Sequence, residues 1–199
     1  MSALLMPVML QPGLQDKRTP PPERIAAQRT ASKRAVRASA TRNAASIGVL
    51  RKAGSGAPLQ TQGWHYSLSH CSSWVAGVIH RAPVGIDVEA VQERRQELVE
   101  KALSDEERSL MPEQDAALAF ARAWTAKESI LKRAGIGLGD LSKCKIIEQQ
   151  AADELVLEYK GERQLVRQLV HEGHVFALHT AGIDWSVSWD GFASIEAGA

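Results

Sequence analysis

Apolar and polar residues alternate at residues 84–89, where Ile86 and Val88 separate Asp87 from Glu89. An alternation of period two is typical of a β-strand. On a strand, Asp87 and Glu89 project from the same face, roughly 7 Å apart. Two ionised carboxylates this close repel each other unless a cation lies between them, and Mg²⁺ prefers oxygen ligands of this kind. The pattern therefore predicts either a cation site or the water-facing side of a sheet edge.

A different pattern covers Ala116–Ala134, which contains neither proline nor glycine and is rich in helix-favouring residues. Residues four apart share one face of a helix, so Trp124, Glu128 and Lys132 form one line. A carboxylate on a partly apolar face is costly to bury unless a metal ion or a cationic partner compensates its charge. The alternative interpretation is an ordinary Glu–Lys pair on a solvated helix face.

The same two periodicities predict further elements on both sides of these two. We expect strands at Trp64–Ser69, Trp74–His80, Lys143–Ile147, Glu154–Tyr159, Leu165–Leu169, Val175–Thr180 and Trp185–Trp189. We expect helices at Glu23–Lys52 and Gln92–Leu103, and a short helix after Ser104, which forms a capping box with Glu107. The helix at Ala116–Ala134 is expected to end at a glycine cap near Gly135.

Helical and strand patterns occur on both sides of a short turn at 81–83, which indicates two α+β halves in one chain. Prolines make residues 1–22 an expected irregular arm. The first half is then expected at 23–83 and the second, which carries the carboxylates, at 84–190. Residues 191–199 are expected to form a tail.

The amino-acid composition says more about the cellular compartment than about the function. With 44% apolar residues the chain can bury a core, and its net charge is only +1. Cys71 and Cys144 form no disulfide framework and no metal-binding spacing, which favours a reducing, cytoplasmic setting. No signal peptide is recognised, and no apolar run approaches the ~20 residues that span a bilayer.

Positive charge is concentrated near the N-terminus. Lys17–Lys52 holds ten lysines and arginines against a single acid, Glu23. These side chains could form a solvated face, or they could hold phosphate, which arginine contacts through two hydrogen bonds. Nucleic-acid binding is disfavoured because the stretch has no aromatic residue to stack on bases.

Three motifs in this order resemble the 4′-phosphopantetheinyl transferase superfamily, and the resemblance is clear over about Trp64–Leu138. The length of 199 residues resembles the longer, pseudo-dimeric type that includes the surfactin-synthetase activator. One departure is Gly56-Ala57-Pro58, where family members often have Gly-Lys-Pro. The motifs read Ser67-Leu68-Ser69-His70, then Gly85-Ile86-Asp87-Val88-Glu89, then Trp124-Thr125-Ala126-Lys127-Glu128-Ser129 with Lys132 four residues after the glutamate.

The resemblance implies an α+β fold of two similar halves and a monomeric transferase that uses Mg²⁺. The enzyme would move the phosphopantetheine arm of coenzyme A to a serine of an apo acyl or peptidyl carrier protein and release 3′,5′-ADP. Asp87, Glu89 and Glu128 would hold the metal. Glu128, a water molecule or Lys132 would assist the proton transfer, with Lys132 also near a phosphate. Ser69 and His70 would bind the 3′-phosphate of coenzyme A, although a lone histidine is often only structural.

Two alternatives remain open from the residues. One is another Mg²⁺-dependent phosphoryl-transfer enzyme built on the same carboxylates. The other is a non-catalytic protein whose basic N-terminal stretch binds an acidic partner or nucleic acid, with a steep salt dependence. The sequence names neither the carrier protein nor its pathway, whether fatty-acid, polyketide, nonribosomal-peptide or siderophore synthesis.

Overall fold

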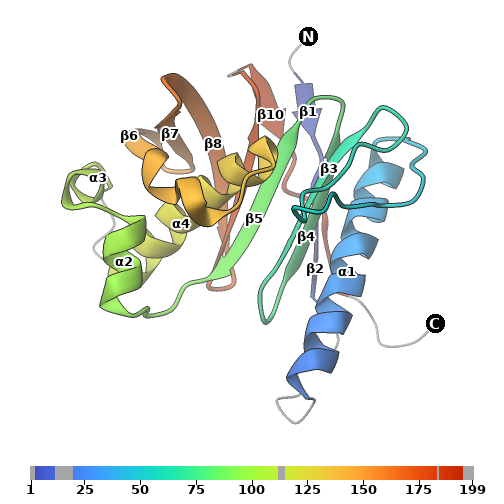
Figure 1. The fold of residues 1–199 in the computed structure, drawn as a ribbon, viewed down its shortest axis with the longest axis horizontal. Coiled ribbons are helices and arrows are strands. Elements are labelled where there is room, and N and C mark those ends of the chain that lie inside the picture. Colours follow the sequence, from blue (N-terminus) through green and yellow to red (C-terminus); the bar gives the residue numbers. More distant parts are fainter. Residues whose placement is uncertain (1–2, 12–19, 112–114, 183, 195–199) are drawn as a thin grey trace. The chain divides into compact units, whose positions relative to one another are not determined.

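The computed structural model describes residues 3–11, 20–111, 115–182 and 184–194, and it shows an α+β protein (Figure 1). The chain divides into two compact units. The first unit contains the described residues of 1–82 and 184–199, and the second contains those of 83–183. Among the helices of the described residues, no segment is long and apolar enough to cross a bilayer.

The first unit is built on a four-stranded sheet of order β11-β2-β4-β3. A pair of parallel strands, β1 and β10, accompanies the sheet. Helix α1, Pro21–Arg42, packs on β4, β3 and β2. It lies close to β4 at Gly77, which has no side chain: a Cβ there would lie 2.3 Å from the backbone nitrogen of Val36. The strands of this unit are β1 (Ala3–Leu5), β2 (Val8–Gln11), β3 (His65–His70), β4 (Val75–His80), β10 (Trp185–Val187) and β11 (Phe192–Ser194).

Both ends of the chain differ from the expectation. The irregular arm is wrong for the described residues, because β1 and β2 form there and α1 begins at Pro21, a favoured first helical position for proline. The helix expected to reach Lys52 ends ten residues earlier, where Asn43 donates its backbone N–H to Ser39 and Ala44 takes a positive φ of 47°. The tail is wrong for Phe192–Ser194, which pairs with β2; residues 12–19 and 195–199 lie outside the described residues.

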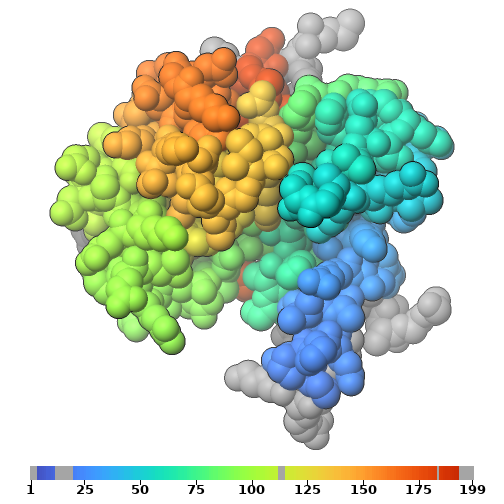
Figure 2. Space-filling model, in the orientation of Figure 1, coloured from blue at the N-terminus to red at the C-terminus, as the bar shows by residue number. Residues whose placement is uncertain are grey.

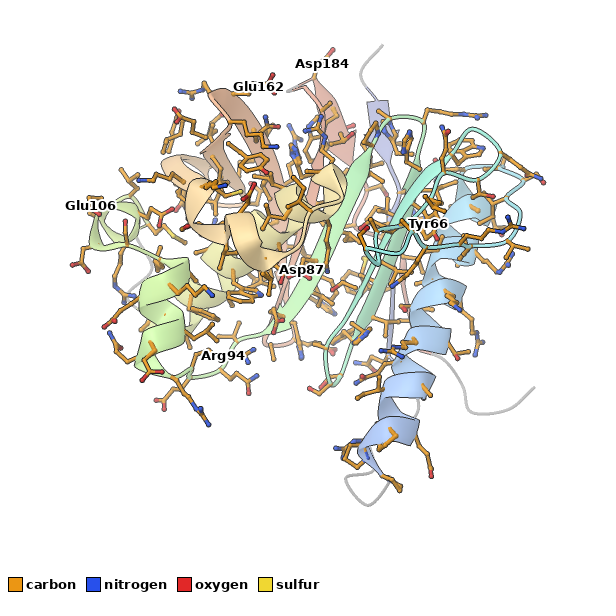
Figure 3. All side chains as sticks on the ribbon, in the orientation of Figure 1. Tyr66, Asp87, Arg94, Glu106, Glu162 and Asp184 are labelled. Atoms are coloured by element: carbon orange, nitrogen blue, oxygen red, sulfur yellow. The ribbon has the colours of Figure 1, made fainter. Side chains whose placement is uncertain are left out.

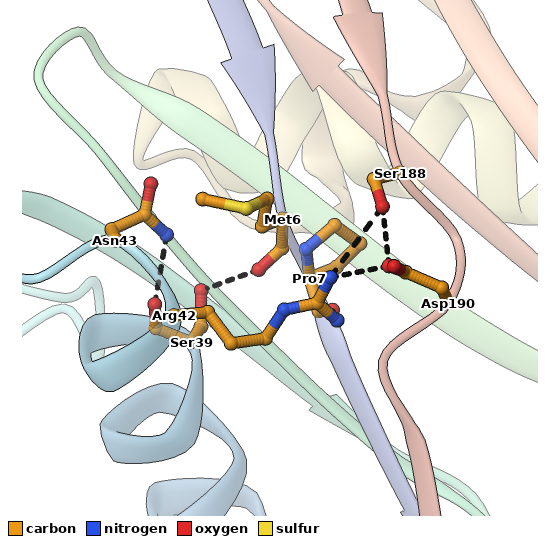
Figure 4. A network of polar contacts seen from close by, with 7 residues as sticks. All are labelled: Met6, Pro7, Ser39, Arg42, Asn43, Ser188 and Asp190. Atoms are coloured by element: carbon orange, nitrogen blue, oxygen red, sulfur yellow. Dashed lines mark hydrogen bonds and ion pairs between the residues drawn. The ribbon is translucent and has the colours of Figure 1, made fainter.

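The C-terminal segment is tied to the first unit by a polar network around Arg42 (Figure 4). The guanidinium of Arg42 donates to Asp190 and to Ser188, and Ser188 also donates to Asp190. On the preceding turn of α1, the hydroxyl of Ser39 donates to the carbonyl oxygen of Met6 over 2.8 Å. These contacts join α1, the N-terminal strands and the segment after β10.

The second unit is a five-stranded antiparallel sheet of order β5-β9-β8-β7-β6. Its predicted strands are confirmed, β7 with the predicted bounds and the others with shifted ends. β6 starts two residues later than expected, because a 3₁₀ helix, η1 at Leu138–Lys143, occupies the residues before it. The strands are β5 (Val84–Ala90), β6 (Lys145–Ala151), β7 (Glu154–Tyr159), β8 (Glu162–His171) and β9 (His174–Thr180).

Helix α4, Ala116–Ala134, lies on one face of this sheet and packs on β5, β9 and β8. Its predicted bounds are confirmed: the side chain of Asp115 caps the first turn, and Gly135 ends the helix with a φ of 69°. The core between α4 and the sheet includes Phe120 and Ile130 of the helix and Ala177 of β9. Two shorter helices, α2 at Gln96–Ala102 and α3 at Asp105–Ser109, precede it, and α3 has the predicted Ser104–Glu107 capping box.

Candidate functional site

The carboxylates of β5 face helix α4. Asp87 is opposite Ala177 of β9 in the antiparallel register, and Ala177 belongs to the core beneath α4. Residues alternate along a strand, so Gly85 and Glu89 share the face of Asp87. Figure 3 shows Asp87 on β5 where α4 passes it. The strand face that carries the two carboxylates is therefore the face covered by α4.

Gly85 allows this close approach between β5 and α4. A Cβ at position 85 would lie only 1.8 Å from the carbonyl oxygen of Ser129 and 2.7 Å from the backbone nitrogen of Arg133. No side chain larger than hydrogen fits that space without moving the helix. Because Ser129 follows Glu128 and Arg133 follows Lys132, the same contact brings the two polar side chains of α4 to the strand.

The side chains from the helix and the strand meet. The Nζ of Lys132 lies 2.6 Å from Oδ1 of Asp87, which is almost completely buried. On the neighbouring position of that face, the guanidinium of Arg94 lies 2.7 Å from Oε2 of Glu89. Each strand carboxylate is thus paired with a cationic side chain. The pairing of Glu89 with Arg94 was missed by sequence reasoning, which treated 92–103 only as a charged helix.

The charges of the neighbouring carboxylates affect the pKa values of Glu89 and Glu128. Burial, and then the charges of Asp87 and Glu89, raise the pKa of Glu128 to about 7, although Lys132 opposes this shift. Burial and the charge of Asp87 also raise the pKa of Glu89, against the lowering effects of Arg94 and Lys132. Shifts of this kind are typical of functional sites, where like charges are held together.

The donor set suits a hard divalent cation, which prefers carboxylate oxygens. A cation of charge +2 would relieve the repulsion that, after burial, raises the pKa values of Glu89 and Glu128. Within residues 3–11, 20–111, 115–182 and 184–194, however, no group of three or more His, Cys, Asp or Glu side chains is arranged to hold a metal. The metal set Asp87, Glu89 and Glu128 therefore stays a prediction.

A second polar contact lies deeper in this unit. Lys127, the neighbour of Glu128, forms an ion pair with Glu107 at 2.7 Å, and both side chains are almost fully buried. Sequence reasoning read Glu107 only as a helix cap and gave Lys127 no role. Lys127 stands in the third motif, next to Glu128, but nothing in the sequence indicates Glu107 as its partner. Trp124, which the sequence places in line with Glu128 and Lys132, stacks on Phe120 with 5.6 Å between the ring centroids.

The predicted phosphate-binding residues belong to the first unit. Ser69 is buried and His70 is half-buried, at the end of β3. Strand alternation puts them on opposite faces, with His70 on the face of Tyr66 and Leu68. The carboxylates and Lys132 belong to the second unit, where they act on one another, while Ser69 and His70 belong to the first unit.

A basic cavity of about 450 Å³ lies in the first unit, and Tyr66 and Leu68 of β3 belong to its lining. Its cationic side chains are exposed at their positions, and α1, blue in Figure 2, presents its outer face on the surface. The sequence indicated only a basic stretch, and the structure gathers three of its ten cations at one cavity. The lining residues are Arg29, Ser32, Lys33, Leu50, Lys52, Tyr66 and Leu68.

Comparison with known proteins identifies the second unit. The family model described as "ACPS: 4′-phosphopantetheinyl transferase superfamily" matches residues 83–181, a stretch that contains Asp87, Glu89, Glu128 and Lys132. The chain is 34% identical over 90 residues to "4′-phosphopantetheinyl transferase psf-1" of Bacillus pumilus, covering 43% of this chain and 39% of the relative.

Two further relatives also bear the name 4′-phosphopantetheinyl transferase. The chain is 30% identical over 93 residues to "4′-phosphopantetheinyl transferase gsp" of Aneurinibacillus migulanus, covering 45% of this chain and 39% of the relative. It is 31% identical over 78 residues to "4′-phosphopantetheinyl transferase" of Bacillus subtilis, covering 37% of this chain and 34% of the relative. The chain thus matches 39% or less of the length of each of these relatives.

Proposed function

Since this chain belongs to the 4′-phosphopantetheinyl transferase superfamily, we propose that it transfers the 4′-phosphopantetheine arm of coenzyme A to a serine of an apo acyl or peptidyl carrier protein. The products would be the holo-carrier and 3′,5′-ADP. The observation that carries this proposal is the meeting of Asp87, Glu89, Glu128 and Lys132 inside the matched stretch. The reaction breaks a pyrophosphate, so it needs charge neutralisation, positioning and one proton removal.

Asp87, Glu89 and Glu128 would hold Mg²⁺ in this protein. The cation, when bound, would neutralise the pyrophosphate oxygens and the charge that develops on the leaving group. Three carboxylates share the two cations Lys132 and Arg94, so one negative charge of the cluster is left over. Burial, and then the charge of Asp87, raises the pKa of Glu89 and of Glu128, which supports a further cation at this place.

Glu128 is our candidate for the group that accepts the serine proton. A carboxylate within hydrogen-bond reach of the serine hydroxyl, directly or through one water, can take up its proton. The pKa of about 7 that burial and the neighbouring carboxylates give Glu128 belongs to the metal-free site, and a bound cation would lower it. Lys132 is partly exposed one turn along α4 and would face a phosphate oxygen with its ammonium group. In the described structure that ammonium neutralises Asp87.

The nucleotide end of coenzyme A would be held by the first unit. Ser69 and His70 are the proposed contacts to the 3′-phosphate. The basic cavity with Arg29, Lys33 and Lys52 supports this part of the proposal, because phosphate groups are bound by clustered cations. Position 57, where relatives often have a lysine, is alanine, so these three side chains would supply the positive charge.

We also propose that the two units are the related halves of a pseudo-dimer, and the topology supports this. In the first unit β2 is followed by α1 and the hairpin β3–β4, and the sheet order is β2-β4-β3. In the second unit β5 is followed by α4 and, after further strands, by the hairpin β8–β9, and the order is β5-β9-β8. All four pairings are antiparallel. Each unit therefore contains the same strand–helix–hairpin arrangement.

The test is a reaction with coenzyme A, Mg²⁺ and a panel of apo carrier proteins, followed by intact mass measurement. At least one carrier should gain the mass of the phosphopantetheine arm while 3′,5′-ADP is released. Folded Glu128→Ala should give no gain, and Lys101→Met, at an exposed position of α2, should behave as the wild type. Release of free phosphate without a heavier carrier would contradict the proposal and favour a phosphohydrolase.

A further inference from the structure

Each of the two carboxylates of β5 forms an ion pair with a cationic side chain. The Nζ of Lys132 lies 2.6 Å from Oδ1 of Asp87, and the Nη2 of Arg94 lies 2.7 Å from Oε2 of Glu89. Lys132 reaches the strand from α4, whereas Arg94 lies in the segment between β5 and α2, labelled in Figure 3. A metal ion that used Glu89 as a ligand would therefore meet a guanidinium already bound to that side chain.

The contact of Arg94 is one that can be released. A single guanidinium nitrogen, Nη2, donates to Glu89, in place of the two-nitrogen fork that makes arginine–carboxylate pairs strong. The Nε of Arg94 is buried and finds no hydrogen-bond acceptor among the described residues. About a quarter of each side chain is exposed, 26% for Arg94 and 27% for Glu89, so water has access to the pair.

A guanidinium of Arg94 released from Glu89 would find other contacts in the groove that Arg94 lines. Arg94 lines a groove of about 490 Å³ in the second unit, with Phe120 on its wall. The guanidinium carbon already lies 5.8 Å from the centre of the Phe120 ring, within the range of a cation–π contact. Glu93, Glu100 and Asp105 also line the groove and supply negative charge near the arginine.

We propose that Arg94 is a built-in competitor of the divalent cation for Glu89: it neutralises Glu89 in the metal-free protein and must leave Glu89 when the metal binds. Arg94 is thus a positioning residue that lowers the apparent affinity of the site for Mg²⁺. This inference rests on the proposed function, because it assumes that Glu89 is a metal ligand. It adds that a residue outside the three motifs determines the Mg²⁺ concentration at which the site is filled.

The experiment is a calorimetric titration of Mg²⁺ into the protein without coenzyme A and without carrier. Arg94→Gln removes the competing charge and should tighten Mg²⁺ binding by about threefold to tenfold, the range expected when a half-buried charged contact is lost. Arg95→Gln is the matched control: it makes the same charge change at the next position, where the side chain is exposed and the backbone carbonyl starts α2. It should leave the dissociation constant within about twofold of the wild type.

Arg94→Lys provides a second measurement with the charge kept, and Mg²⁺ affinity should then fall between those of the wild type and Arg94→Gln. Weaker Mg²⁺ binding by Arg94→Gln overturns the proposal, because Arg94 would then orient Glu89 for the metal. Equal tightening by Arg94→Gln and Arg95→Gln overturns it as well, since the effect would be one of general charge. In both cases the wild type still binds Mg²⁺ and the proposed function stands. Absence of Mg²⁺ binding by the wild type and every variant overturns both.

Discussion

The Nζ of Lys127 lies 2.7 Å from Oε1 of Glu107, and both side chains are almost completely buried, at 3% and 8% exposure. Glu107 is satisfied on both oxygens: Oε1 also accepts from the backbone N–H of Ile146, and Oε2 accepts from that of Ser104. One carboxylate therefore joins α3, β6 and α4 inside the second unit. Because Glu128 follows Lys127 on the same helix, this ion pair also fixes the part of α4 that carries the candidate site.

Removing the ammonium should destabilise the protein strongly. Lys127→Met leaves the charge of Glu107 buried without its partner, and the breaking of such buried pairs costs about 3–5 kcal/mol. Urea unfolding followed by tryptophan fluorescence measures the loss. Lys101→Met, at an exposed position of α2, is the control and should change the free energy of unfolding by less than about 0.5 kcal/mol. A cost below about 1 kcal/mol for Lys127→Met would show that water reaches Glu107.

Gly85 should not tolerate a methyl group. In Gly85→Ala the new Cβ would lie 1.8 Å from the carbonyl oxygen of Ser129, so α4 must move away from β5. We expect a loss of more than about 3 kcal/mol in unfolding free energy, above the common range for overpacked cores. Gly139→Ala is the matched control, because no atom lies within 4 Å of the Cβ that it adds. Similar stability of the two variants would mean that α4 and β5 can separate at little cost.

The sequence predicted α4 and β5 well because their signals are local. A stretch of 19 residues without glycine or proline, between the cap Asp115 and Gly135, fixes both ends of α4. Strict alternation fixes β5 and the shared face of its carboxylates. One-turn spacing on α4 put Glu128 and Lys132 on one face of the helix. The contact between Lys132 and Asp87 was not predicted, because it depends on how α4 packs on β5.

What the sequence missed depends on partners far along the chain. Strand β1 exists because it pairs with β10, and β2 pairs with β4 and β11, so three or four apolar residues near the N-terminus gave too weak a signal. The early end of α1 at Arg42 depends on a positive φ at Ala44, which alanine does not announce. The pairs Lys127–Glu107 and Arg94–Glu89 require the tertiary fold, since charge alone does not choose among many nearby residues.

Glu128→Gln should abolish transfer while the metal-free protein keeps or gains stability. The substitution removes one of three mutually repelling carboxylates and preserves the side-chain shape. Thermal unfolding without metal should give a Tm equal to or above that of the wild type. Addition of Mg²⁺ should raise the Tm of the wild type more than that of the variant. A clearly lower Tm for the metal-free variant would contradict repulsion at this position.

His179 should make the protein lose stability in mild acid. Its ring is fully buried, its Nδ1 bonds the carbonyl oxygen of Leu165 at 2.9 Å, and its Nε2 finds no partner among the described residues. Burial lowers the pKa of His179 to about 4, from 6.5 in an unfolded chain. The unfolded state therefore binds more protons between these values, so stability falls as pH drops from about 6.5 to 4, by at most about 1.4 kcal/mol per pH unit.

Chemical unfolding at several pH values checks the contribution of His179. His179→Asn keeps a donor for Leu165 but cannot titrate, so its stability should fall less steeply below pH 6.5, even if a cavity lowers the whole curve. His171→Asn, at a partly exposed position of β8, is the control for the loss of a histidine elsewhere. Parallel curves for His179→Asn and the wild type would exclude His179 as the source of the acid sensitivity.

Arg29 and Arg37 should differ in their effect on coenzyme A, although both are exposed on α1 and lie two turns apart on the same face. Arg29 lines the basic cavity with Lys33 and Lys52, whereas Arg37 lies outside its lining. Arg29→Gln should weaken coenzyme A binding by about threefold to tenfold, since one charge-assisted contact to phosphate is lost. Arg37→Gln removes the same charge and should change coenzyme A affinity by less than about twofold, because exposed charges are screened. Calorimetry at two salt concentrations separates the cases: equal losses that vanish together at high salt would make α1 a general positive surface, and a loss confined to Arg29→Gln would make the cavity the nucleotide site.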